Sequence, residues 1–118
     1  MRYFLSLFLP LWLFASEISI QVLGSGGPEI GGREYASYIV KKDNKELILI
    51  DFGGGTFLRF GQAKAGIDDL RVVLHSDLHI DQVVDIAALI KAVDFYQANR
   101  PLAIDGPDSN KYFPSIDE

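Results

Sequence analysis

Two glycine-rich segments interrupt the first half of the chain, and they restrict its fold more than any other feature. Residues 24–32 and 53–55 hold most of the 11 glycines. Glycine weakens helices and strands and readily adopts positive φ, so neither segment belongs inside a regular element. Each segment follows an apolar stretch. The sequence therefore predicts short strands that end in glycine-rich turns.

The apolar stretches have the residue pattern of half-buried strands. Residues 18–24 alternate apolar and polar side chains and are rich in β-branched residues. Residues 35–42 and 46–51 are expected to form two strands joined at Asp43-Asn44, because both residue types tolerate positive φ in a tight hairpin turn. Two further strands are predicted over residues 71–74 and 101–104.

Two helices are predicted between the later strands. Residues 56–65 are expected to form a short helix with Phe57, Leu58 and Phe60 on its buried side. A second helix, of about fifteen residues, is expected to begin with Asp81 as its N-cap. Apolar residues at helical spacing define its buried face: Val83, Ile86, Ala87, Ile90 and Val93.

The order β-β-β-α-β-α-β predicts an α/β domain, in which a mixed sheet carries helices on one face. Nothing in the sequence supplies a cover for the other face. Either a second chain or the rest of a longer domain is therefore expected to cover it.

Residues 1–16 are expected to lie outside this domain, which occupies residues 17–118. Arg2 precedes an almost unbroken apolar run of about thirteen residues, shorter than the roughly 20 that a membrane span needs. The segment therefore resembles a secretory signal peptide, with an uncleaved N-terminal anchor as the alternative. A periplasmic or secreted protein without a transmembrane span is predicted.

Charge and cysteine content exclude several kinds of site. The chain carries 11 Lys and Arg against 16 Asp and Glu, for a net charge of −5, so nucleic-acid binding is not expected. The absence of cysteine excludes disulfides and thiolate zinc ligands. Glu29 stands where a dinucleotide-binding glycine motif needs its last glycine, so nucleotide binding is not expected either.

The segment between the fourth strand and the second helix contains both histidines of the chain. His75, Asp77, His79 and Asp81 are spaced by two, so an extended backbone would project these metal-ligating groups to one side. A structural interpretation is equally open: Asp81 caps the helix, Asp77 binds loop amides, and His75 is a strand residue with a hydrogen-bonded ring.

Four segments, in this order, resemble the metallo-β-lactamase-fold hydrolases, particularly the branch similar to ribonuclease Z and related exported hydrolases. They are Leu23-Gly-Ser-Gly-Gly-Pro28, Leu49-Ile-Asp51-Phe-Gly53, Asp77-Leu-His79-Ile-Asp81-Gln82 and Pro101-Leu-Ala-Ile-Asp-Gly-Pro107. The third segment aligns with the family motif His-x-His-x-Asp-His, and together the four cover nearly all of residues 18–110. The resemblance implies that the chain is the N-terminal half of an αββα sandwich.

The same resemblance implies a zinc site, with two zinc ions in a complete family member. It implies that His79 binds the first metal, that Asp81 binds the second and is catalytic, and that Asp51 supports the site from nearby. Asp77 and Gln82 stand where the family has histidines. Asp77 can still bind zinc through oxygen, whereas the Gln82 amide is a poor ligand. His75 is the candidate replacement ligand.

The resemblance therefore implies an exported, zinc-dependent hydrolase of an ester, amide or phosphodiester bond. The small number of ligands predicts that these 118 residues are incomplete or impaired as a catalyst, because the family's remaining ligands lie in the half that follows. The alternative is a degenerate, non-catalytic relative that acts as a binding protein. Self-association through the uncovered sheet face is a further expectation.

Overall fold

A computed structural model describes residues 16–98, 100–109 and 111. The predicted signal peptide therefore lies outside the described residues, apart from Ser16. The elements in chain order are β1 (Ile18–Gly24), β2 (Ser37–Lys42), β3 (Lys45–Ile50), α1 (Thr56–Gln62), β4 (Val72–Leu74), α2 (Ile80–Val83), α3 (Ile86–Phe95) and β5 (Ala103–Asp105). All predicted strands are present, with ends shifted by at most two residues.

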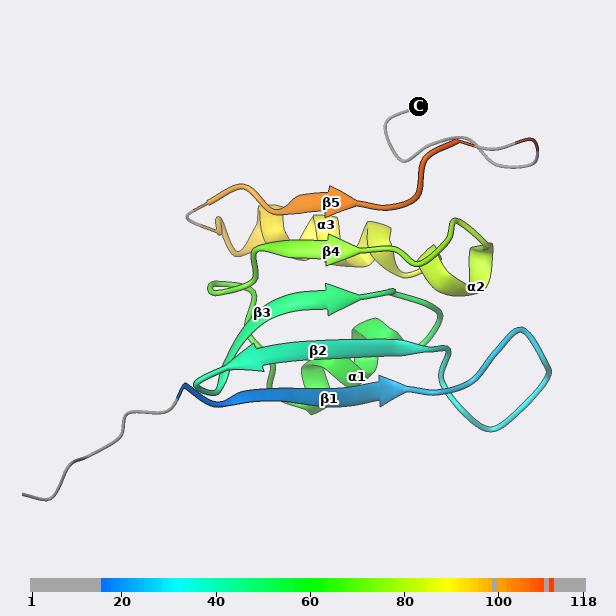
Figure 1. Cartoon of the computed structure of the whole chain (residues 1–118), viewed down its shortest axis with the longest axis horizontal. Coiled ribbons are helices and arrows are strands. Elements are labelled where there is room, and N and C mark those ends of the chain that lie inside the picture. Colours follow the sequence, from blue (N-terminus) through cyan, green and yellow to red (C-terminus); the bar gives the residue numbers. More distant parts are fainter. Residues whose placement is uncertain (1–15, 99, 110, 112–118) are drawn as a thin grey trace, which may run out of the picture.

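The strands form one five-stranded mixed sheet in the order β1-β2-β3-β4-β5 (Figure 1). Strands β1, β2 and β3 pair antiparallel, whereas β4 pairs parallel with both β3 and β5. Asp43 and Asn44 have φ angles of 52° and 62° in the turn between β2 and β3. The predicted mixed sheet and its hairpin are therefore confirmed.

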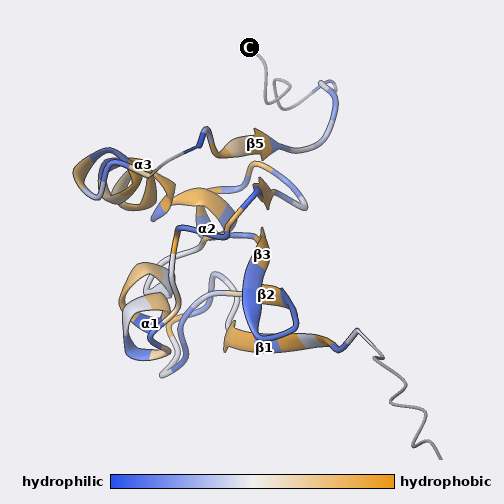
Figure 2. Cartoon of the chain, turned by 90° about the vertical axis from the view of Figure 1, so that its left-hand side faces the viewer, coloured by the Kyte–Doolittle hydropathy of each residue, from blue (hydrophilic) through white to orange (hydrophobic). Residues whose placement is uncertain are grey.

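Helices α1 and α3 pack on the same face of the sheet (Figure 2). The core between the layers contains four strand residues, Leu23, Ile39, Leu49 and Val73, and buried side chains from the connections and helices, which are Phe52, Phe60, Leu70 and Leu89. This face therefore holds the hydrophobic core of the described part of the chain.

The prediction for the buried side of α1 was only partly right. Thr56 and Phe60 are buried, because residues four apart share one face of a helix. Leu58 points away from this face and is 63% exposed, and Phe57 lies at its edge with its ring against Phe52. A short helix buries a narrow stripe, so three apolar residues in this stretch cannot all face the core.

The prediction of one helix starting at Asp81 was wrong. The segment is divided into α2 and α3, with His79 and Asp85 at their N-cap positions. The amide of Asp85 donates to the carbonyl of Phe52 (3.1 Å), and the amide of Phe52 donates to the carbonyl of Gln82 (2.8 Å). The Asp85 carboxylate accepts a hydrogen bond from the amide of Phe57 at the start of α1 (3.0 Å). These contacts with the segment after β3 interrupt the helix.

The division also changes which residues of α3 face the core. Leu89, which the predicted apolar face omitted, is fully buried, whereas Ile90 is 50% exposed and Ala87 is exposed. Ile86 and Val93 are half-buried, as expected for residues beside the buried stripe. The buried side of α3 is therefore centred on Leu89 rather than on the predicted set of residues.

The face of the sheet opposite the helices is apolar and uncovered by the described residues. Ile18, Ile20 and Val22 of its edge strand are 70%, 66% and 57% exposed. The strand register extends this face across the sheet through Tyr38, Val40, Ile48, Ile50, Val72, Leu74 and Ala103, and we call these ten residues the open sheet face. The expected uncovered face is thus present. In the described part of the chain, no helix has the length and apolar character needed to cross a membrane.

Candidate functional site

The histidine- and aspartate-rich loop, residues 75–82, follows the carboxyl end of β4. Strand β4 lies between β3 and β5 and is parallel to both, so the three strands end on the same side of the sheet. Ligand sites of open α/β sheets are commonly found outside the carboxyl ends of such strands. The fold therefore puts the predicted site where a ligand would be expected.

Asp51 anchors the beginning of this loop. Its carboxylate accepts two hydrogen bonds from Ser76, one from the amide to Oδ1 (2.7 Å) and one from the hydroxyl to Oδ2 (2.8 Å). Asp51 is 4% exposed and has a φ of 56°, a conformation that Asp tolerates better than most residues. With both oxygens engaged, the Asp51 carboxylate holds Ser76 at the beginning of the loop.

Ser76 was not identified from the sequence. The available signal was a serine two residues beyond one predicted strand, together with a carboxylate at the end of another predicted strand. That signal is weak because Ser76 and Asp51 are 25 residues apart, and their contact follows only from the parallel pairing of β3 and β4.

His75 is buried, at 5% exposure, behind the loop. Its amide donates to the carbonyl of Asp105 (2.8 Å), which continues the β4–β5 pairing. Its Nδ1 lies 4.0 Å from Oδ1 of Asp51 and has no hydrogen-bond partner among the described residues. Burial lowers the pKa of the His75 imidazole, while the charges of Asp51 and Asp77 and the backbone of Gln82 act in the opposite direction.

Asp77 and His79 contact each other at the exposed part of the loop. Oδ1 of Asp77 accepts a hydrogen bond from the His79 amide (2.8 Å) and lies 2.9 Å from Nδ1 of His79. Both side chains are about half exposed, so they are accessible from solvent. Two of the predicted metal ligands are therefore adjacent, and Asp77 also binds a loop amide as the structural interpretation expected.

Asp81 and Gln82 lie in the first turn of α2. The Gln82 amide donates from Nε2 to Oδ2 of Asp81 (3.3 Å), and Oε1 of Gln82 is buried without a partner among the described residues. The carbonyl of Asp81 approaches Gly53 so closely that a Cβ on Gly53 would lie 2.0 Å from it. Gly53 therefore permits close packing of the segment after β3 against α2.

The loop does not project its four candidate ligands to one side, contrary to the expectation from an extended backbone. His75 is buried, Asp77 and His79 are partly exposed, and Asp81 lies in a helix. Among residues 16–98, 100–109 and 111, no group of three His, Cys, Asp or Glu side chains is arranged to hold a metal ion. Zinc requires three or four such donors, so the described residues alone do not form a zinc site.

The sequence matches no family model. It is 31% identical over 99 residues to a ribonuclease Z of Methanosarcina mazei, and the match covers 84% of this chain and 32% of that protein. The chain thus spans about a third of the length of this curated relative. The family predicted from the four sequence motifs is therefore found by direct comparison as well.

Solved structures show the same fold. The metallo-β-lactamase fold protein YhfI from Bacillus subtilis superposes with a TM-score of 0.65 at 21% identity, covering 80% of this chain and 39% of that one. A diphosphatase of the PhnP family superposes with a TM-score of 0.59 at 19% identity, covering 76% and 41%. The expected α/β architecture and the family resemblance are thus confirmed. By its sequence and its fold, the chain belongs to the metallo-β-lactamase-fold hydrolase family, and it comprises part of that fold.

Proposed function

We propose that this chain is part of a metal-dependent hydrolase that cleaves a phosphodiester bond, with residues 75–82 at its reaction site. The observation that carries the proposal is the exposed pair of Asp77 and His79 at the carboxyl end of β4, on a loop held in place by Asp51. The compared proteins include a ribonuclease and a diphosphatase, and both names denote cleavage of a bond to phosphorus. This favours phosphodiester over amide hydrolysis.

The metal that we propose is zinc, for which imidazole and carboxylate are ordinary ligands. Asp77, His79 and Asp81 are the proposed ligands, and Asp81 is also the proposed catalytic residue. Because the described residues bring together fewer than three of these donors, the proposal requires further donors from outside this part of the chain. We assign no chemical step to the isolated loop.

A small phosphodiester is favoured over RNA as the substrate. Nucleic-acid binding requires free basic groups along a surface, whereas this chain has a net charge of −5. Four basic side chains of the described residues are already paired with carboxylates: Arg33 with Glu29 (3.6 Å), Lys41 with Glu46 (3.3 Å), Arg59 with Glu34 (2.8 Å) and Lys91 with Asp94 (2.6 Å). Cleavage of RNA is therefore the outcome that would correct this part of the proposal.

The first test is the zinc content of the purified 118-residue chain after dialysis against metal-free buffer. Because the described residues supply fewer than three donors, we expect less than one equivalent of bound zinc. This zinc should be lost in His79→Ala and retained in Asp94→Asn, a control on the exposed face of α3. If neither the parent chain nor the control retains zinc, metal binding by this chain is excluded.

The alternative function is a non-catalytic binding protein. The observation in its favour is that Asp77 and His79 contact each other and that Gln82 occupies a ligand position and contacts Asp81, so these side chains already interact with one another. This alternative predicts a chain that folds without zinc and whose stability does not change when zinc is added. Thermal unfolding with and without one equivalent of zinc separates the two functions.

We also propose that residues 1–16 direct export to the periplasm or the medium. The support is the short apolar run after Arg2. Expression of the full chain followed by cell fractionation and intact-mass measurement tests this. An exported protein without the first residues is expected, and a full-length membrane-bound protein would instead indicate an uncleaved anchor.

A further inference from the structure

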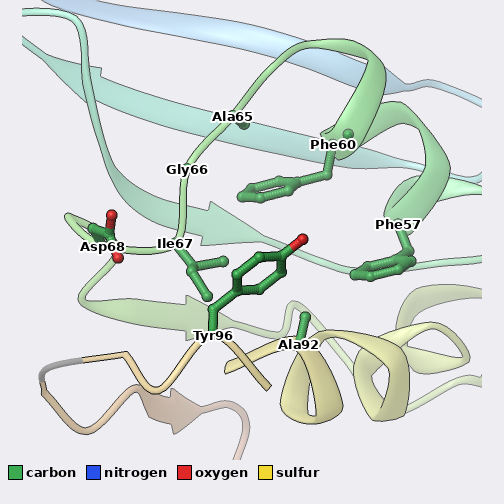
Figure 3. Close-up of a pocket in the computed structure, with 9 residues that line it drawn as sticks. Phe57, Phe60, Ala65, Gly66, Ile67, Asp68, Ala92 and Tyr96 are labelled. Carbon is green, nitrogen blue, oxygen red and sulfur yellow. The ribbon is translucent and has the colours of Figure 1, made fainter. Parts of the chain in front are cut away.

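A cavity of about 580 Å³ lies between α1, α3 and the segment that leads into β4 (Figure 3). Its volume is in the range of small-molecule sites, about 300–1,000 Å³. The side chains that define its chemistry are Phe57 and Phe60 of α1, Ile67 and Asp68 of the connecting segment, and Ala92 and Tyr96 at the end of α3.

This cavity is separate from the candidate reaction site. Residues 61–68 precede β4, and the loop of residues 75–82 follows it, so the two regions lie toward opposite ends of that strand. None of the residues 75–82 lines the cavity. A ligand in the cavity would therefore bind independently of any metal at the loop.

The walls of the cavity are mainly aromatic and aliphatic. Phe60 is buried, whereas Phe57 is 39% exposed and Tyr96 is 68% exposed. In Figure 3 the rings of Phe60 and Tyr96 face the space between the two helices. An apolar body in this space would remove exposed aromatic surface from water, which is favourable.

Asp68 is the one charged residue in the cavity lining. It is exposed, and within the part of the chain that the structure describes no Lys, Arg or His side chain forms an ion pair with it. A carboxylate at the rim of an apolar cavity attracts a cation through charge and accepts its hydrogen bonds. An anion would be repelled by the same charge.

We propose that this cavity binds a small organic cation, an ammonium group carried on an apolar aryl or alkyl body. The aromatic and aliphatic walls contact the body, and the Asp68 carboxylate accepts the ammonium hydrogens. Specificity for the positive charge is assigned to Asp68, and affinity for the apolar body to the walls formed by α1 and α3.

The test compares three probes that share one phenylbutyl body: 4-phenylbutylammonium, 4-phenylbutanol and 4-phenylbutanoate. Calorimetric titration of the full chain at neutral pH should give the lowest dissociation constant for the ammonium, a value about fivefold higher for the alcohol, and the highest for the carboxylate. Asp68→Asn should raise the dissociation constant of the ammonium to that of the alcohol, and it should leave the dissociation constant of the alcohol unchanged.

Matched variants separate this charge effect from a change in fold. Asp69→Asn removes the neighbouring carboxylate, which does not line the cavity, and should leave all three constants unchanged. Ala92→Leu places a larger side chain in the cavity wall and should raise the dissociation constants of all three probes by the same factor. Equal binding of the alcohol and the ammonium, no effect of Asp68→Asn, or no binding of any probe to the folded chain would overturn the proposal.

Discussion

Both carboxylate oxygens of Asp51 accept hydrogen bonds from one residue, Ser76, through its amide (2.7 Å) and its hydroxyl (2.8 Å). The Asp51 amide donates in turn to the carbonyl of Leu74 (2.8 Å), so the end of β3 is joined to the end of β4 by backbone and side chain together. The candidate site loop begins at this junction. Its starting direction therefore depends on Asp51.

Replacement of Asp51 is expected to destabilise the fold substantially. Asp51→Ala removes the acceptor of two hydrogen bonds in a buried position, and we expect a loss of about 2–3 kcal/mol in the free energy of unfolding. Ser76→Ala removes only the hydroxyl donor and should cost about 1–2 kcal/mol. Urea unfolding measures both values. Asp94→Asn on the exposed face of α3 is the control. A loss of unfolding free energy of similar size in this variant would contradict the structural role assigned to Asp51 and Ser76.

Gly53→Ala is expected to be strongly destabilising. The added Cβ would lie 2.0 Å from the carbonyl oxygen of Asp81 and 2.6 Å from Cβ of Tyr35, so the backbone must move. We expect a loss of about 3 kcal/mol, at the upper end of overpacking effects. Gly61→Ala is the matched control, because nothing lies within 4 Å of a Cβ at this position in α1. That variant should be unchanged or stabilised by up to about 1 kcal/mol in thermal unfolding.

The stability of the metal-free protein is expected to fall between neutral and mildly acidic pH because of His75. Burial lowers the pKa of His75 from 6.5 in the folded state, so the neutral ring is the form that the fold favours. The stability that the neutral His75 ring contributes is fully present at pH values above the pKa of His75 in the unfolded chain. It is lost as the pH falls below that pKa, because the unfolded chain then binds more protons than the folded chain.

The measurement is the free energy of unfolding from pH 8 to pH 5 in the presence of a chelator. The parent chain should lose stability below about pH 6.5. The His75→Asn variant should not show this loss of stability. It should still lose stability at lower pH, where the carboxylates become protonated. Identical pH profiles for the two proteins would show that His75 contributes nothing to the pH dependence.

The isolated chain is expected to self-associate through the open sheet face. This face carries apolar side chains on all five strands, with Asp105 at its β5 edge, and exposed apolar patches of this kind promote association. Light scattering after size exclusion at two concentrations should show an apparent mass that increases with concentration. Ile20→Lys, in the middle of the exposed edge of the face, should reduce this increase, whereas Gln62→Lys on α1 should not. A monomer at both concentrations would contradict the prediction.

Family membership and the position of the candidate loop could be read from the sequence because their signals are local. Asp77, His79 and Asp81 lie within five consecutive positions; in the structure Asp77 and His79 lie between β4 and α2, whereas Asp81 lies inside α2. The pairing of Asp77 with His79 and the burial of His75 could not be predicted this way. They depend on where α2 begins and on what packs behind β4.

The sequence by itself determined the strands, the Asp43-Asn44 hairpin and the apolar open sheet face. Alternation and turn preference act between neighbouring residues, so they need no knowledge of distant contacts. Tertiary structure decided the division of the helix at Asp85 and the support of the loop by Ser76. In both cases a group is bound by a partner 25 or more residues away, and only the assembled sheet determines which partner it meets.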